Sequence, residues 1–150
     1  MPISEICNRE VVIVQPDETA LEAGKLMRQY HVGDVVVVVE DSDGERVPVG
    51  VVTDRDLVVE IVAPGLDPGT ITVGDIMTPE VATVKESAGI FEAIEYMRAK
   101  GVRRLPVVKE SGGLVGILTL DDLLGLLAEE LLALSRLVKH EQQKEASNRH

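Results

Sequence analysis

The chain has 150 residues, enough for about one ordinary domain that buries roughly two-thirds of its unfolded surface. Its formal net charge of −11 opposes general nucleic-acid binding, and its one Phe, two Tyr and no Trp exclude the aromatic platforms of single-strand binding. A single cysteine, Cys7, supplies neither an internal disulfide nor a cysteine metal set. The sequence opens without a basic-then-apolar leader and lacks an apolar run of about 18 residues. We therefore expect a cytoplasmic protein with no membrane or nucleic-acid partner.

The first half of the chain predicts a strand, a helix, a hairpin and a second helix. The expected segments are a strand at 11–14, a helix over 20–30, strands at 32–39 and 47–52, and a helix after Thr53 that ends before Pro64. Asp17 or Thr19 can cap the first helix, whose apolar face includes Leu21 and Tyr30. Five consecutive valines make the 32–39 strand too uniformly apolar for a half-exposed position, so we expect it to be covered on both faces.

The second half repeats this order after a turn-rich connector at 64–69. Its expected segments are a strand at 81–84, a helix over 88–100 and a strand at 105–108. Residues of the two halves correspond at a constant offset of 70 positions as far as the second hairpin turn. That turn is four residues shorter than the first one. A deletion confined to a turn indicates two copies of one unit. The predicted fold class is α/β (α+β), with two β-α-β-β-α repeats packed about a pseudo-two-fold axis and a long C-terminal helix.

One pattern occurs at 50–57 and again at 116–123: Gly, two apolar residues, Thr, and an Asp three positions after the Thr. It predicts a buried strand that turns into a helix, with the Asp at or near the helix N-terminus. Backbone N–H groups and the positive end of the helix dipole suit a bound anion there. We interpret the pair as a ligand site made twice. In the simpler alternatives, Asp56 and Asp122 are helix caps, and Thr53 and Thr119 end strands.

The last predicted helix continues far beyond the second copy of this pattern. Its apolar residues alternate by three and four, the a/d spacing of a helix that packs on another helix: Leu124, Leu127, Leu131, Leu134 and Val138. The stripe can fold back on the core or pair with a second subunit, and we favour the second subunit. From about His140 the residues are polar, and we expect them to fray. The three histidines lack metal-ligand spacing, so no metal site is expected.

These repeats, each ending in Gly-apolar-apolar-Thr-x-x-Asp, resemble cystathionine-β-synthase (CBS) domains in tandem. The stretches Asp-Ile-Met-Thr-Pro at 75–79 and Val-Arg-Arg-Leu-Pro-Val-Val at 102–108 are similar to other common stretches of that family. The resemblance covers residues 4–126. It implies a module that binds adenosine-containing ligands such as AMP, ADP, ATP or S-adenosylmethionine, with no catalytic cofactor. It also implies a homodimer that regulates another protein, here a separate and unidentified target.

The resemblance carries roles to individual residues. The motif aspartates accept hydrogen bonds from both ribose hydroxyls, which suits a carboxylate with two acceptor oxygens. The motif threonines offer a hydroxyl to ribose or phosphate. The residue before each motif Asp faces the phosphates, and it is Arg55 in the first copy but Asp121 in the second. The nucleotide-binding residues expected in this way are Thr53, Arg55, Asp56, Arg103, Arg104, Pro106, Thr119 and Asp122.

By the same resemblance, each cleft borrows the middle strand of the other repeat. The Asp56 cleft then faces the arginines at 103–104, whereas the Asp122 cleft faces Gly-Asp at 33–34. Charge-assisted hydrogen bonds contribute about 1.5–3 kcal/mol each, so we expect the nucleotide phosphate in the Asp56 cleft. For the other cleft three alternatives stay open: it takes adenosine without phosphate, uses Arg104 of its own repeat, or stays empty. A solvated arginine pair at 103–104 is the plainer alternative.

We divide the chain into a first repeat at 1–65, a second at 66–126 and a helical extension with a polar tail at 127–150. The favoured function is a regulatory module that senses an adenine nucleotide by changing shape or assembly. An enzyme is disfavoured, because the sequence lacks a Ser-His pairing, a Walker-type lysine loop and a His-carboxylate metal set. A third hypothesis is a structural dimerisation module with degenerate clefts.

Overall fold

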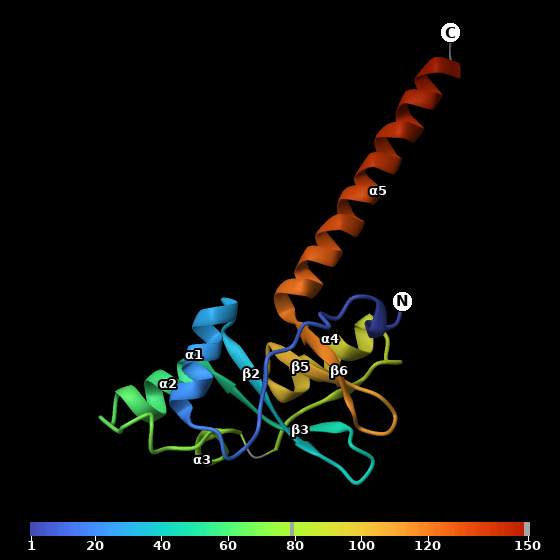
Figure 1. Cartoon of the computed structure of the whole chain (residues 1–150). Helices are drawn as coiled ribbons and strands as arrows, with labels where there is room; N and C mark the ends of the chain where they lie inside the picture. The colour runs from blue at the N-terminus through green and yellow to red at the C-terminus, as the bar shows by residue number, and fades with distance from the viewer. Residues whose placement is uncertain (79, 149–150) are drawn as a thin grey trace. The chain divides into compact units, whose positions relative to one another are not determined.

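The computed structural model describes residues 1–78 and 80–148, so Pro79 of the 75–79 stretch and His150 lie outside the described residues (Figure 1). The chain forms two units, Met1–Leu118 and Thr119–His150. The elements of the first unit are η1 (Ile3–Glu5), β1 (Ile13–Val14), α1 (Ala20–Tyr30), β2 (Asp34–Glu40), β3 (Arg46–Thr53), α2 (Asp54–Leu57), η2 (Val58–Val62), α3 (Val73–Ile76), β4 (Val84–Lys85), α4 (Ile90–Lys100), β5 (Arg104–Val108) and β6 (Leu114–Thr119). The second unit contains Thr119, the last residue of β6, and one helix, α5 (Leu120–Asn148).

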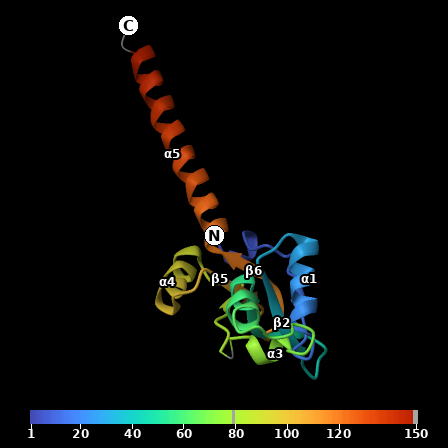
Figure 2. The ribbon, with the colours of Figure 1, turned by 90° about the vertical axis from the view of Figure 1, so that its left-hand side faces the viewer.

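The first unit contains two equivalent three-stranded sheets, β1-β2-β3 and β4-β5-β6. In each sheet a two-residue strand runs parallel to the middle strand, with Ile13 opposite Val36 and Val84 opposite Val107. Figure 2 shows α1 and α4 on opposite sides of the strands. The predicted class of two repeated α/β units with a long C-terminal helix is confirmed. The parallel strands β1 and β4 are shorter than the predicted segments at 11–14 and 81–84.

The valine run of β2 is buried on both faces over Val35–Val38, as predicted, whereas Val39 at its end is 39% exposed. Val35 and Val37 lie in a cluster with Ala23 and Met27 of α1. Val36 and Val38 lie on the other face with Ile117 of β6. Successive side chains of a strand point to opposite faces, so a strand covered twice needs apolar residues at every position. This strand joins the two repeats in one core.

The two repeated helices begin and end at corresponding positions. Thr19 caps α1 by accepting the Glu22 N–H at 3.1 Å, and His31 ends it in the left-handed region at φ 54°. Gly101, at the offset of 70, ends α4 at φ 67°. The prediction that Leu21 and Tyr30 lie on the apolar face of α1 was wrong, because both are exposed. Leu21 is about 100° around the helix from buried Ala20, and Tyr30 lies in the last turn.

The segment that leads into each repeat packs against the other repeat (Figure 1). The Ile3 N–H donates to the Ala88 carbonyl, and the Val73 N–H donates to the Glu18 carbonyl. The two donors are 70 residues apart, and so are the two acceptors. Ile3 and Val73 are both fully buried. Likewise the bridge between Pro2 and Gly89 matches the bridge between Thr72 and Thr19. The repeats therefore exchange their lead-in segments, which the sequence did not reveal.

This exchange gives a structural reason for the glycine of the repeated pattern. A Cβ at Gly50 would lie 2.6 Å from Sδ of Met77, and a Cβ at Gly116 would lie 2.6 Å from the carbonyl oxygen of Asn8. Both neighbours belong to the lead-in segment of the other repeat. The glycines are therefore required by close packing of that segment.

Gly116→Ala is expected to destabilise the protein by about 1–3 kcal/mol, because the clash is with backbone that cannot turn aside. Gly50→Ala is expected to cost less, since the Met77 side chain is flexible. Urea unfolding measures both, with Gly125→Ala in α5 as control. Apart from its chain neighbours and the backbone of its own helix, no described residue has an atom within 4 Å of its Cβ position. Equal losses for the first two variants would contradict this explanation.

One prediction about the second unit was wrong. Residues from His140 do not fray: α5 continues through Asn148. The sequence Glu-Gln-Gln-Lys-Glu-Ala at 141–146 consists of good helix formers with no Gly or Pro, which supports continuation. The predicted a/d stripe is exposed along the helix, with Leu131 at 70% and Leu134 at 59%. No helix within the described part of the chain is long and apolar enough to span a membrane.

Candidate functional site

The site is built on the turn from β3 into α2. Thr53 ends the strand with extended backbone, at φ −105° and ψ 164°, and is the N-cap of the helix. Its Oγ1 accepts the Asp56 N–H at 3.1 Å, and Oδ2 of Asp56 accepts the Thr53 N–H at 2.9 Å. The two residues thus form a reciprocal capping box. Asp56 is the third helical residue, and the cap is Thr53.

The capping box leaves both side chains able to bind a ligand. A hydroxyl that accepts a hydrogen bond still has its own O–H to donate, and a carboxylate with one oxygen engaged has a second. The simpler alternatives for Thr53 and Asp56 are therefore correct as structural roles. Thr53 and Asp56 can also bind a ligand in these positions, because the capping bonds use one atom of each side chain.

A cavity of about 560 Å³ opens beside this turn. Its volume is in the range of small-molecule sites. Six of the eight predicted residues line it: Thr53, Arg55, Asp56, Arg103, Arg104 and Pro106. The first three come from the first repeat and the others from β5 and the residue before it. Residues about 50 positions apart in the chain are thus brought to one cavity.

The charge of this cavity differs in sign from that of the chain. Four basic side chains line it, Arg55, Lys100, Arg103 and Arg104, against three carboxylates, Asp54, Asp56 and Glu80. The formal excess is one positive charge in a protein of net charge −11. A cleft that gathers cations on a negative molecule favours an anion.

Several lining residues were missed by the sequence reasoning. Valine and alanine side chains form an apolar wall: Val51, Val81, Ala82 and Val102. Lys100 is the last residue of α4, with Nζ 5.8 Å from the centre of the Tyr96 ring. Val51 lies in the 50–57 pattern, and Val81 and Val102 correspond to Val11 and Val32 of the first half, but the repeat does not show which of its apolar residues face a cavity. Lys100 corresponds to Tyr30, so the repeat gives no sign of a cation there. Together the wall and the cations offer apolar contacts for a ring and charged contacts for a phosphate.

Arg104 also lies against a carboxylate, a contact that was not predicted. Its Nε is 2.9 Å from Oδ2 of Asp34, with the side chains 32% and 18% exposed. Nε is buried and makes no hydrogen bond with the described residues, so the contact is an ion pair without hydrogen-bond geometry. Asp34 and Arg104 are the first residues of β2 and β5, 70 positions apart. Equivalent positions of the two repeats thus carry opposite charges.

Burial raises the pKa of Asp34 above its ordinary value of 3.8; Arg104 opposes the rise, and Asp54 adds to it. A carboxyl group with a raised folded-state pKa contributes stability below its unfolded value, and this contribution is lost as the pH rises through the folded value. Asp34→Asn is therefore expected to raise the melting temperature at neutral pH, with the gain shrinking as the pH falls toward 3.8. Thermal melts of wild type and variant across that range measure it. A gain that persists at the lowest pH would contradict the assignment.

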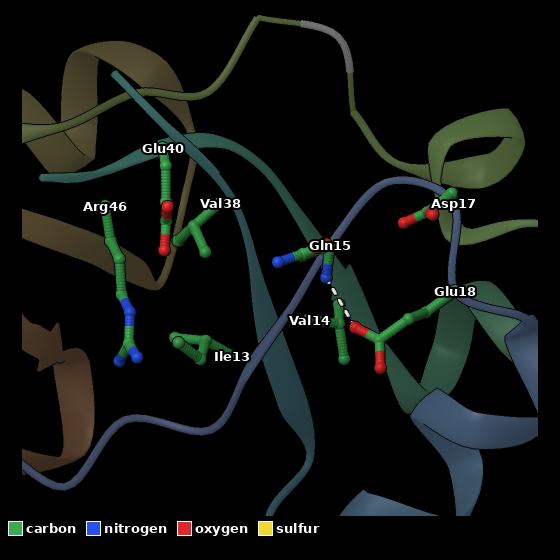
Figure 3. Close-up of a pocket in the computed structure, with 8 residues that line it drawn as sticks. All are labelled: Ile13, Val14, Gln15, Asp17, Glu18, Val38, Glu40 and Arg46. Carbon is green, nitrogen blue, oxygen red and sulfur yellow. Dashed lines mark hydrogen bonds between the residues drawn. The ribbon is translucent and has the colours of Figure 1, made fainter. Parts of the chain in front are cut away.

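A second cavity, of about 350 Å³, lies in the first repeat (Figure 3). None of the predicted residues lines it. Three carboxylates, Asp17, Glu18 and Glu40, face it with one cation, Arg46, and Oε2 of Glu18 already accepts the Gln15 N–H at 2.6 Å. Its charge makes it a poor phosphate site.

The remaining two predicted residues, Thr119 and Asp122, belong to the second unit. There the Thr119 Oγ1 accepts the Asp122 N–H at 3.1 Å, as in the first copy. In the described part of the chain, no three His, Cys, Asp or Glu side chains are grouped to hold a metal ion.

Comparison with known proteins gives the family. A family model described as the CBS domain matches residues 3–63 and 73–129. An uncharacterized protein of Methanopyrus kandleri is 40% identical over 122 residues, 81% of this chain but only 60% of that protein. Hypoxic response protein 1 of Mycobacterium tuberculosis is 35% identical over 128 residues, 85% of this chain and 86% of that one.

Among solved structures, a CBS domain protein of Pyrobaculum aerophilum complexed with AMP is similar, with a TM-score of 0.72 and 30% identity over 81% of this chain and 89% of that chain. The two segments matched by the family model coincide with the two repeats that the offset of 70 relates. The chain belongs to the CBS domain family, and it contains a tandem pair of these domains.

Proposed function

We propose that this protein is a regulatory module that binds an adenine nucleotide in the cavity beside Asp56. The observation that carries the proposal is the composition of that cavity: an apolar wall, a helix-terminal carboxylate and an excess of cations. The AMP in the P. aerophilum relative supports the same ligand class. AMP, ADP and ATP are the candidate ligands, and S-adenosylmethionine is a further one.

In this proposal each part of the cavity has one task. Asp56 accepts hydrogen bonds from the ribose hydroxyls through the oxygen that the capping box leaves available, and Thr53 donates its hydroxyl to ribose or phosphate. Arg55, Arg103 and Arg104 hold the phosphate. The apolar wall of Val51, Val81, Ala82 and Val102 packs on the base, together with Pro106. Three different contact types at one site select a nucleotide over adenosine or phosphate alone.

We also propose that α5 pairs with α5 of a second copy of this chain. Its exposed a/d stripe has the spacing of a helix packed on a helix. The first half of α5 carries only carboxylates among its charged residues, Asp121, Asp122, Glu129 and Glu130, and the second half carries Arg136, Lys139 and Lys144 against two glutamates. An antiparallel pair therefore places acidic and basic halves side by side, which supports a homodimer.

We propose that the module regulates a separate target protein. Binding can report nucleotide levels only if the occupied state favours one conformation or assembly. The repeats at 1–65 and 66–126 are proposed as the sensing part and 127–150 as the assembling part. No residue around the cavity forms a nucleophile–base pair of the kind that hydrolysis requires among the described side chains, so a binding role is the simpler proposal.

Isothermal titration calorimetry with adenosine, AMP, ADP, ATP and S-adenosylmethionine tests the proposal. Saturable binding of at least one of the nucleotides is expected. No heat from any of them up to about 1 mM would overturn the ligand class. In that case the structural dimerisation module is favoured, and light scattering should show a dimer. Neither its mass nor its melting temperature should change when nucleotide is added. Phosphate released during prolonged incubation with ATP would instead favour an enzyme.

A further inference from the structure

The ion pair between Arg104 and Asp34 places a carboxylate against one of the cations that line the cavity. Arg104 lines the cavity, whereas its Nε contacts Oδ2 of Asp34 at 2.9 Å. Nε carries one of the five N–H donors of a guanidinium, and the other four lie on the two terminal nitrogens. Arg104 can therefore bind a phosphate, but its charge is partly neutralised before any ligand arrives.

The surroundings of Asp34 make this neutralisation strong. The side chain is 18% exposed, and charges that are shielded from water interact more strongly than charges at the surface. A second carboxylate, Asp54, lies nearby and also lines the cavity, and its interaction with Asp34 is repulsive. A phosphate that approaches Arg104 thus enters a cluster of one cation and two carboxylates.

We propose that Asp34 is a specificity-determining residue of the cavity, because its carboxylate competes with the ligand phosphate for the guanidinium of Arg104. This inference rests on the proposed nucleotide site. Asp34 weakens binding of ligands that place phosphate charge at Arg104 and leaves binding of an uncharged nucleoside unchanged. The Asp34–Arg104 pair thus sets how strongly the cavity distinguishes AMP from adenosine.

Asp34→Asn keeps the size of the side chain and removes its charge. The variant is expected to bind AMP at least about fivefold more tightly than wild type, because one nearby negative charge is removed, whereas the affinity for adenosine is unchanged. In an Arg104→Gln background, Asp34→Asn is expected to give no such gain, because the competition needs the guanidinium. The four proteins form a double-mutant cycle.

Asp17→Asn is the matched control, because it removes the same charge from a carboxylate that lines the other cavity. Calorimetric titration of each variant with adenosine and with AMP gives the result. A gain for AMP that is specific to Asp34→Asn and disappears with Arg104→Gln supports the inference. An equal gain in Asp17→Asn indicates a general effect of net charge and overturns it.

Weaker AMP binding by Asp34→Asn also overturns the inference, because it shows that Asp34 positions Arg104 for the phosphate. Unchanged AMP binding overturns it as well. Both results leave the nucleotide site intact, since wild type still binds AMP. If wild type binds neither adenosine nor AMP, the proposed function itself fails, and the inference fails with it. Thermal melts check that each variant is folded, and Arg104→Met, which also lacks the charge, replaces Arg104→Gln if the latter unfolds.

Discussion

Asp56→Ala is expected to weaken AMP binding by one to two orders of magnitude. A charge-assisted hydrogen bond contributes about 1.5–3 kcal/mol, and truncation of Asp56 removes the acceptor proposed for the ribose hydroxyls. Calorimetry on wild type and variant measures the change. The same substitution also removes half of the capping box with Thr53, so the loss of affinity must be separated from a loss of helix stability.

The chain offers a matched control for this. At the start of α3, Asp75 accepts the Thr72 N–H, with its Oδ2 3.3 Å from the Thr72 nitrogen, as Asp56 accepts the Thr53 N–H, and Asp75 does not line the cavity. Asp75→Ala should lower the melting temperature about as much as Asp56→Ala and leave AMP binding unchanged. Equal losses of affinity would show that Asp56 acts through folding. A larger loss in Asp122→Ala would show that the other copy of the pattern binds the phosphate ligand.

Leu131→Asp is expected to dissociate the proposed dimer. Leu131 lies on the a/d stripe of α5 and is 70% exposed in the single chain. Removing a leucine from the interface costs about 1.5–3 kcal/mol on each copy, so the dissociation constant should rise by roughly a hundredfold or more. Sedimentation equilibrium or light scattering over a range of protein concentrations measures it.

Leu132→Asp is the control, because Leu132 is the adjacent residue, is 52% exposed and lies off the stripe. It carries the same change of charge and size on the same helix. Its effect on the dimer should be small. Dissociation by both substitutions would show that the interface does not follow the a/d spacing. A wild-type protein that stays monomeric at high concentration would contradict the dimer altogether.

The repeated architecture could be predicted from the sequence because its signals are local and occur twice. The valine run predicted a strand covered on both faces, and the constant offset of 70 related the two halves. The exchange of lead-in segments could not be predicted, because Ile3 and Val73 make pairings with residues about 85 and 55 positions away that no local pattern encodes. The packing role of the glycines at 50 and 116 could not be predicted for the same reason.

The site was predictable only where it reuses the repeated pattern. Thr53 and Asp56 were found by the motif, and the arginines at 103–104 by resemblance to the family. The apolar wall lies in segments that the repeat relates, but the repeat does not show which of their residues face the cavity, and only the fold brings them there together with Lys100. The ion pair of Asp34 with Arg104 joins two residues that the sequence assigned to different clefts.

Titration of isotopically labelled protein with AMP, followed through the backbone amide resonances, locates the bound nucleotide. The largest shifts are expected at the amides of Thr53, Arg55, Asp56 and Arg103, around the cavity between β3, α2 and β5. Shifts confined to the second cavity, at Gln15 and Glu18, or no shifts at saturating AMP, would contradict binding at that site.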